Sequence, residues 1–234
     1  MRVFLAAIIA GCAACSSRFP DVPLNRGLQS LRPNAVIDIA DGTRTIAFVA
    51  TVDRTALALG QSITFTTTVG SFSPSGTTIT VPVDAADSAV AQLRAPADTS
   101  AGMVIASMGG VSASTPVTFL KAPPTGIEIA ESPPILVAGP NSNVVLTVTL
   151  TRDTGSPSPG FVVHFSSDSS SHCVGTFGAD SIVEVNDTVR VGFAVADTLC
   201  EGTVTVHVFA SRGSDSTQTF SRAIPVVQPP PPSH

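Results

Sequence analysis

The chain has 234 residues, of which 43% are hydrophobic and only 12% are charged, with a formal net charge of −5 at pH 7. This composition excludes a highly charged disordered polymer, and the length suits two domains of about 100 residues each. The only lysine is Lys121 and basic residues do not cluster, so we expect no binding to nucleic acid. Tryptophan and tyrosine are absent. A carbohydrate partner is therefore not expected, because rings with a polar edge commonly form such platforms.

The first residues are typical of a targeting segment. One positive charge at Arg2 precedes an apolar run at residues 3–10, far shorter than the ~20 residues that a membrane-spanning helix needs. The next motif, Ile9-Ala10-Gly11-Cys12, resembles the bacterial lipobox. This resemblance implies a signal peptide at residues 1–11, cleavage before Cys12, and acyl chains on Cys12 that anchor the chain in a membrane.

Two alternatives to this interpretation stay open. Cys15 is a second candidate for lipidation, although no aliphatic residue stands three positions before it. Ordinary secretion, with cleavage near Ala14, would leave the chain without an anchor. Ala13 after Cys12, in place of aspartate, resembles the outer-membrane sorting pattern of Gram-negative lipoproteins. We therefore expect a lipid-anchored protein of the cell envelope, at the outer membrane or cell surface rather than the inner membrane.

Residues 12–33 contain three prolines and no alternation of apolar residues, which predicts a tether. From residue 34 onward, apolar residues recur at every second position, the period of a strand with one buried face. A Gly109-Gly110 hairpin signal precedes a last strand at residues 111–120. The alternating positions of this block are Ile46, Phe48, Ala50 and Val52, then Ile63 and Phe65, then Val104 and Ala106.

A linker at residues 121–126, stiffened by Pro123 and Pro124, separates this block from a second one at residues 127–227. No stretch shows the 3.6-residue period of an amphipathic helix, so we predict an all-β fold. Residues 228–234 (QPPPPSH) are predicted to be an exposed tail, because proline lacks the amide hydrogen that a sheet uses. The alternating positions of the second block are Val144, Leu146, Val148 and Leu150, then Val189, Val191, Phe193 and Val195, then Val204, Val206 and Val208.

The two blocks share short motifs in the same order, about 100 residues apart. An internal repeat of this length indicates tandem domains, at residues 34–120 and 127–227. The matched pairs are Ile63-Thr64-Phe65 with Val163-His164-Phe165, Gly70-Ser71-Phe72 with Gly175-Thr176-Phe177, Asp98-Thr99 before Gly102 with Asp197-Thr198 before Gly202, and Thr118-Phe119 with Thr219-Phe220.

The first repeat resembles the bacterial immunoglobulin-like domains of the invasin and intimin type, above all at residues 41–48 (DGTRTIAF), 61–72 (QSITFTTTVGSF) and 104–111 (VIASMGGV). The likeness covers roughly residues 35–120 and, more loosely, 126–227. It implies two tandem immunoglobulin-like β-sandwiches of the kind that serve as spacers or adhesive tips on bacterial surfaces, with no catalytic residue and no cofactor. We expect an adhesion or protein-binding module; the alternative is a non-binding spacer or an accessory subunit of an envelope complex.

Cys173 and Cys200 remain in the body of a chain that we expect to be exported to an oxidising compartment. Strand order in an immunoglobulin-like sandwich brings the loops that carry them to the same pole. The resemblance therefore implies a Cys173–Cys200 disulfide. The alternative is a catalytic or metal-binding thiol pair.

His164 and His207 are candidate metal ligands, with His172 nearby in the sequence of the same block. They lack a close two-histidine spacing or an adjacent carboxylate, so we expect polar surface residues and no metal. We expect four scattered aspartates to stabilise turns. The alternative is that they form a weak calcium site. No Gly-x-Ser-x-Gly motif occurs, and we expect no enzyme. The four aspartates are Asp168, Asp180, Asp187 and Asp197.

Overall fold

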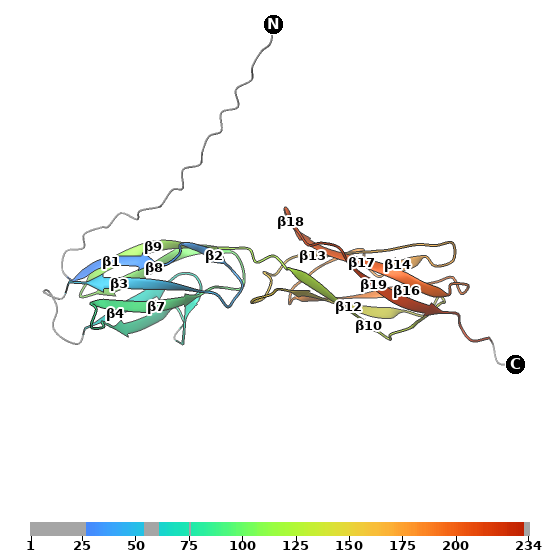
Figure 1. The fold of residues 1–234 in the computed structure, drawn as a ribbon, viewed down its shortest axis with the longest axis horizontal. Coiled ribbons are helices and arrows are strands. Elements are labelled where there is room, and N and C mark those ends of the chain that lie inside the picture. The colour runs from blue at the N-terminus through green and yellow to red at the C-terminus, as the bar shows by residue number, and fades with distance from the viewer. Residues whose placement is uncertain (1–26, 54–60, 75, 232–234) are drawn as a thin grey trace, which may run out of the picture.

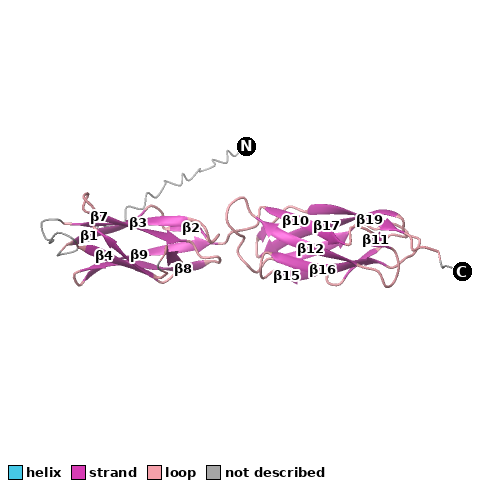
Figure 2. Cartoon of the chain, turned by 90° about the horizontal axis from the view of Figure 1, so that it is seen from below, coloured by secondary structure: helices cyan, strands magenta, loops and turns pink. Residues whose placement is uncertain are grey.

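The structure is a computed structural model that describes residues 27–53, 61–74 and 76–231. These residues form strands β1 to β19 and no helix, which confirms the predicted all-β fold. Two β-sandwiches lie end to end, joined by the segment after residue 120 (Figure 1). Figure 2 shows the same arrangement from below. Within the described ranges, no helix is long and apolar enough to cross a membrane.

Each sheet of the first sandwich contributes one face to a shared core. One sheet has the order β1-β3-β7-β5 and the other β2-β9-β8-β4-β6, with β2 parallel to β9. The first sheet consists of β1 (Leu28–Pro33), β3 (Thr45–Val52), β7 (Ser88–Arg94) and β5 (Ser71–Phe72). The second consists of β2 (Ile37–Ile39), β9 (Val111–Leu120), β8 (Ser100–Met108), β4 (Ser62–Thr67) and β6 (Thr78–Pro82).

The second sandwich repeats this topology strand for strand, in the orders β10-β12-β16-β14 and β11-β19-β17-β13-β15. Its added element is β18 (Asp215–Ser216), which folds back on the end of β17. The first sheet has β10 (Gly126–Ser132), β12 (Val144–Thr151), β16 (Thr188–Val195) and β14 (Gly175–Phe177). The second has β11 (Leu136–Val137), β19 (Phe220–Val227), β17 (Gly202–Arg212), β13 (Val162–Ser167) and β15 (Ser181–Val183).

The alternating apolar positions fill two separate cores. In β3 the side chains of Ile46 and Phe48 are buried while those between them are partly exposed, and β12 repeats this pattern at Leu146 and Val148. Burial of these side chains removes apolar surface from water, which is the main force that holds each sandwich together. The core of the first sandwich extends from Leu28 to Phe119 and that of the second from residue 127 to 226.

Two predicted boundaries differ from the structure. Gly126, the last residue of the predicted linker, is the first residue of β10. The predicted tether at residues 12–33 includes β1, whose Leu28 is fully buried and pairs with Val52. The register shifts between Leu28 and Ser30, so β1 lacks the strict two-residue period by which the other strands are found in the sequence. Pro33 is tolerated because it ends a strand at the edge of the sheet.

One predicted motif match also fails. The parallel pairs Asp38–Phe119 and Leu136–Val226 place Phe119 near the end of β9 in the position that Val226 holds in β19. Phe220 instead begins β19. The Thr-Phe dipeptides at residues 118 and 219 therefore do not occupy equivalent positions. Cys12, Cys15 and the predicted signal peptide lie outside the described residues, and residues 228–231 of the predicted tail are exposed.

Candidate functional site

Cys173 and Cys200 form a disulfide, with 4.9 Å between their Cα atoms. Cys173 lies in the loop between β13 and β14, and Cys200 lies just before β17. β17 runs from this end of the second sandwich to Arg212 beside the first sandwich. The disulfide therefore joins two loops at the end of the molecule that faces away from the first sandwich, which we call the distal pole (residues 168–174 and 196–201).

Asp197 fixes the turn that leads to Cys200. Its Oδ1 accepts a hydrogen bond from the N–H of Leu199 at 2.9 Å, and its Oδ2 lies 3.0 Å from Nδ1 of His172. Its backbone carbonyl accepts the N–H of Cys200. The hydrogen bond from Leu199 and, to a smaller extent, the one from His172 hold the pKa of Asp197 below its usual value. The turn is thus held at both ends, by a carboxylate and by a disulfide.

Two aliphatic side chains project from this fixed backbone. Leu199 is 61% exposed and Val174, next to Cys173, is 54% exposed. Exposed aliphatic groups cost little on their own, but a backbone that is already ordered loses less entropy when a partner binds. The distal pole can therefore present Leu199 and Val174 as preorganised apolar contacts to a protein surface.

The histidines predicted as surface residues bond to hydroxyl and carboxylate groups on the second sandwich. Nε2 of His164 lies 3.0 Å from Oγ of Ser211, and its ring stacks on Phe209 with 4.5 Å between centroids. His207 bridges Ser221 and Asp168, at 2.8 and 3.0 Å. In the ranges that the structure covers, no three histidine, cysteine or acidic residues gather in a group that could hold a metal ion.

A second site lies where the sandwiches meet, at residues 40–44, 94–99, 121–125, 152–161 and 212–215, which we call the joint. Oδ1 of Asp41 accepts hydrogen bonds from the N–H groups of Thr43 and Arg44 at 2.9 and 2.8 Å, and Oδ2 lies 3.2 Å from Nε of Arg44. Burial opposes ionisation of Asp41, but these bonds and the charge of Arg44 outweigh it and keep its pKa below the usual value. The turn is therefore a fixed polar surface.

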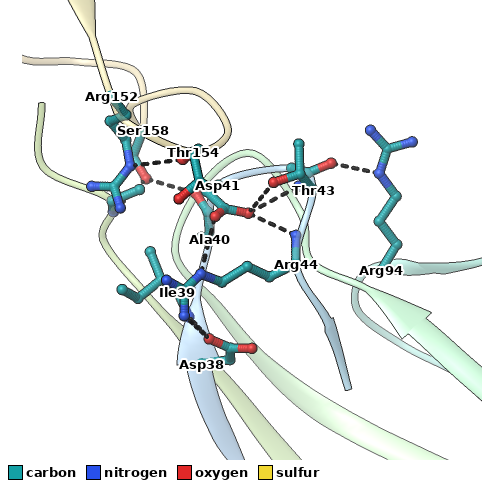
Figure 3. A network of polar contacts seen from close by, with 12 residues as sticks. Asp38, Ile39, Ala40, Asp41, Thr43, Arg44, Arg94, Arg152, Thr154 and Ser158 are labelled. Atoms are coloured by element: carbon teal, nitrogen blue, oxygen red, sulfur yellow. Dashed lines mark hydrogen bonds and ion pairs between the residues drawn. The ribbon is translucent and has the colours of Figure 1, made fainter. Parts of the chain in front are cut away.

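The loop at residues 152–161 of the second sandwich binds this turn (Figure 3). The Oγ of Ser158, itself fully buried, donates to the carbonyl of Ala40 at 3.2 Å, and the N–H of Ser156 donates to the carbonyl of Asp41 at 3.1 Å. Gly155 approaches so closely that a Cβ atom there would lie 2.6 Å from the carbonyl oxygen of Asp41. Only glycine fits here, because a Cβ atom would clash with Asp41. The φ of +70° at residue 155 favours glycine as well.

Charged pairs complete the joint. Nη1 of Arg212 lies 3.0 Å from Oδ1 of Asp98 in the first sandwich, and it also donates to the carbonyl of Pro159 at 2.6 Å. Nζ of Lys121 lies 2.6 Å from Oδ2 of Asp215. Sequence reasoning missed this site, since Asp98 and Arg212 stand 114 residues apart and no local pattern links them.

The joint and the distal pole are equivalent ends of the two repeats. The N–H groups of Ala40 and Ala138 bond to the last carbonyls of β9 and β19, so Gly139 holds the place of Asp41. At this end of the second sandwich, glycine thus stands in the position where the carboxylate of Asp41 organises the joint. Asp197 holds the place of Asp98, but its partner is His172 of the same domain rather than an arginine of another. The chemistry of the joint is therefore not repeated at the distal pole.

A shallow groove of about 660 Å³ with mostly apolar walls runs beside the joint. Leu120 of the first sandwich, which is 52% exposed, and Asp215 of the β17–β18 hairpin both line it. Both sandwiches contribute to this groove. It is lined by Thr99, Ser100, Ala101, Thr118, Phe119, Leu120, Lys121, Pro123 and Asp215.

No protein-family model and no curated protein matches the sequence. The crystal structure of invasin, "a bacterial integrin-binding protein", matches with a TM-score of 0.69 and 22% identity over 87% of this chain and 40% of invasin. The fold is that of the invasin-type immunoglobulin-like domains. The Yersinia pseudotuberculosis adhesin InvE matches at 18% identity with a TM-score of 0.48, over 86% of this chain and 60% of InvE. The chain thus spans less than two thirds of either relative.

Proposed function

We propose that the chain is an exported, lipid-anchored protein of the bacterial cell envelope that acts as an adhesion or protein-binding module. The observation that carries this proposal is the distal pole, where Leu199 and Val174 are exposed on loops held by the Cys173–Cys200 disulfide. Invasin, whose fold this chain shares, is an integrin-binding protein, which supports a protein partner here. The partner surface in this proposal is the distal pole.

The arrangement of the chain supports this role. Leu28 pairs with Val52, the end of β3 farthest from the joint, so a chain held by acyl groups on Cys12 or Cys15 enters the first sandwich at the opposite end from the distal pole. Two sandwiches in series then hold Leu199 away from the membrane. This geometry is what an anchored binding tip requires.

We propose no catalytic activity for this module. The side chains of His172 and Asp197 bond to each other, and His207 bonds to Asp168 and Ser221. These bonds hold loops and a sheet face in place, and none of the five side chains lines the groove beside the joint.

The test is a capture experiment with the mature chain and four variants, using envelope and host-cell extracts. Leu199→Asp and Val174→Asp place a charge on the distal pole, and Leu120→Asp places one in the groove. Val90→Asp is the matched control, because Val90 is an exposed aliphatic residue (43%) on a sheet of the first sandwich. We expect a partner that is retained by the control and lost with both pole variants.

Two other outcomes would contradict the proposal. Loss of the partner with Leu120→Asp, while both pole variants still bind, would move the partner surface to the groove. Failure of every extract to yield a partner that depends on any of these residues would favour a spacer in the envelope. Circular dichroism of each variant separates loss of contact from loss of fold.

A further inference from the structure

An acidic pair lies next to the joint, at the turn between β15 and β16, and of its two members Glu184 is buried and Asp187 is partly buried. Glu184 is only 1% exposed, and its Oε1 accepts the backbone N–H of Asp187. Asp187 has a φ of 59°, a left-handed conformation that brings this N–H toward Glu184. Among the described residues, Oε2 of Glu184 is buried without a hydrogen-bond partner. A charged carboxylate in such a position is costly, whereas a neutral carboxyl group is much less so.

The loop at residues 152–161 lies on this pair. The N–H of Gly160 donates to the backbone carbonyl of Glu184 at 3.2 Å, and the N–H of Glu184 donates to the carbonyl of Phe161 at 2.8 Å. Ser156 hydrogen-bonds to the side chain of Asp187. The N–H of Ser156 also donates to Asp41 of the first sandwich. One loop therefore contacts the acidic pair on one side and the first sandwich on the other.

Arg212 links the same groups electrostatically. Its guanidinium binds Asp98 and the carbonyl of Pro159, and its charge also acts on Glu184. Of the other charged groups at the joint, Lys121 pairs with Asp215 and Arg44 with Asp41. The remaining three have other partners: Arg94 donates to the carbonyl of Gly42, Arg152 donates to the carbonyl of Pro123, and Asp153 accepts the hydroxyl of Thr125. Arg212 thus interacts with a carboxylate of the first sandwich and with Glu184 of the second.

We propose that the Glu184–Asp187 pair makes the joint sensitive to pH, so that the two sandwiches are held together most firmly in mildly acidic solution. Protonation of Glu184 removes the buried charge and the repulsion between Glu184 and Asp187. It also removes the attraction between Glu184 and Arg212, so that of these two carboxyl groups only Asp98 still attracts the guanidinium. The loop that carries Ser156 and Ser158 is then stabilised against the first sandwich.

The direction follows from the carboxyl groups themselves. Burial raises the pKa of Glu184 above 4.5 and that of Asp187 above 3.8, and the charge of Asp187 adds to the effect on Glu184. A raised pKa in the folded protein stabilises it fully below the ordinary value, and this stabilisation is lost as pH rises through the raised value. Burial works against ionisation of Asp98, but its bonds to Arg212 and Thr99 keep its pKa below 3.8. The loop that covers Glu184 is also the loop that contacts the first sandwich. We therefore expect the joint to be firmest above the pKa of Asp98 and below that of Glu184.

Amide hydrogen exchange by NMR on the full chain tests this. The N–H groups of Ser156 and Ser158 bond to Asp41 and Ala122, so their protection reports closure of the joint. After correction for intrinsic exchange rates, we expect the N–H groups of Ser156 and Ser158 to be protected roughly three- to tenfold more at about pH 5 than at about pH 7.5. Core amides of β12 serve as the control and should change less, apart from Leu150, whose N–H donates to the carbonyl of Asp187. Equal or lower protection of Ser156 and Ser158 at the acidic pH would overturn the proposal.

Glu184→Gln provides the matched variant, because it keeps the shape of the side chain and removes its titration. We expect high protection of Ser156 and Ser158 at both pH values in this variant. A pH dependence unchanged from that of the natural chain would assign the effect to another group and overturn the proposal. If Glu184→Gln does not fold, Asp187→Asn removes the repulsion instead and is expected to reduce the pH dependence.

Discussion

Arg212 of the second sandwich binds Asp98 of the first, with 3.0 Å between Nη1 and Oδ1. The same guanidinium nitrogen donates to the carbonyl of Pro159 in the loop that touches the Asp41 turn. One side chain thus connects the charged pair to the backbone contacts of the joint. This is why a linker of a few residues can hold the two sandwiches in series.

Arg212→Ala is expected to loosen the joint without unfolding either sandwich. The side chains of Arg212 and Asp98 are 27% and 44% exposed, so we expect a loss of about 0.5–1 kcal/mol of coupling. Limited proteolysis of the linker at residues 121–126 should become faster. Arg190→Ala, an exposed arginine on β16, is the control and should leave the cleavage rate unchanged. Equal cleavage of the Arg212 and Arg190 variants would show that the pair does not hold the joint.

Gly155→Ala should open the joint more strongly. Its Cβ would lie 2.6 Å from the carbonyl oxygen of Asp41, and alanine is strained at a φ of +70°. We expect a loss of roughly 1–3 kcal/mol in the closed state. Gly109→Ala is the matched control, because Gly109 also has a positive φ but no atom within 4 Å of its Cβ position. Exchange at the Ser156 N–H measures the difference, and similar protection in both variants would contradict this account.

Replacing both disulfide cysteines by serine should destabilise the second sandwich by roughly 3–4 kcal/mol in the chain-entropy model for a loop of this length. The two residues stand 27 positions apart. Urea unfolding measures the loss. The double variant avoids a free thiol, and the unfolding of the first sandwich provides an internal reference. A change of less than about 1 kcal/mol would mean that the loop stays ordered without the bond.

Cys12→Ser is expected to abolish incorporation of labelled palmitate and to release the chain from the membrane fraction. Cys15→Ser should leave both unchanged. These expectations rest on the resemblance of residues 9–12 to a lipobox. Retention of the label in Cys12→Ser, with loss in Cys15→Ser, would move the anchor to the second cysteine. Absence of the label in the unaltered chain would favour ordinary secretion.

Much of the fold could be predicted from the sequence because burial on one face of a strand imposes a period of two. Phe48 and Leu146 lie in such patterns and are buried. The Cys173–Cys200 disulfide could be anticipated because strand order determines which loops meet. β1 was missed because its register shift after Leu28 breaks the period.

The joint could not be predicted for a different reason. Its contacts connect residues more than 100 positions apart, such as Ser158 with Ala40, and they depend on how two finished sandwiches pack. A serine and a glycine in one loop and an arginine at the end of β17 carry no shared local pattern. Exposure of Leu199 likewise follows from the turn fixed by Asp197, and an alternating pattern does not reveal it.

Whether the distal pole binds a partner is tested most directly by the dissociation constant of a captured partner, measured for the unaltered chain, Leu199→Asp and Val90→Asp. We expect Leu199→Asp to weaken binding by about 30-fold or more, the effect of a contact worth about 2 kcal/mol, and Val90→Asp to change it little. Equal affinity for all three proteins would contradict the assignment of the distal pole as the partner surface.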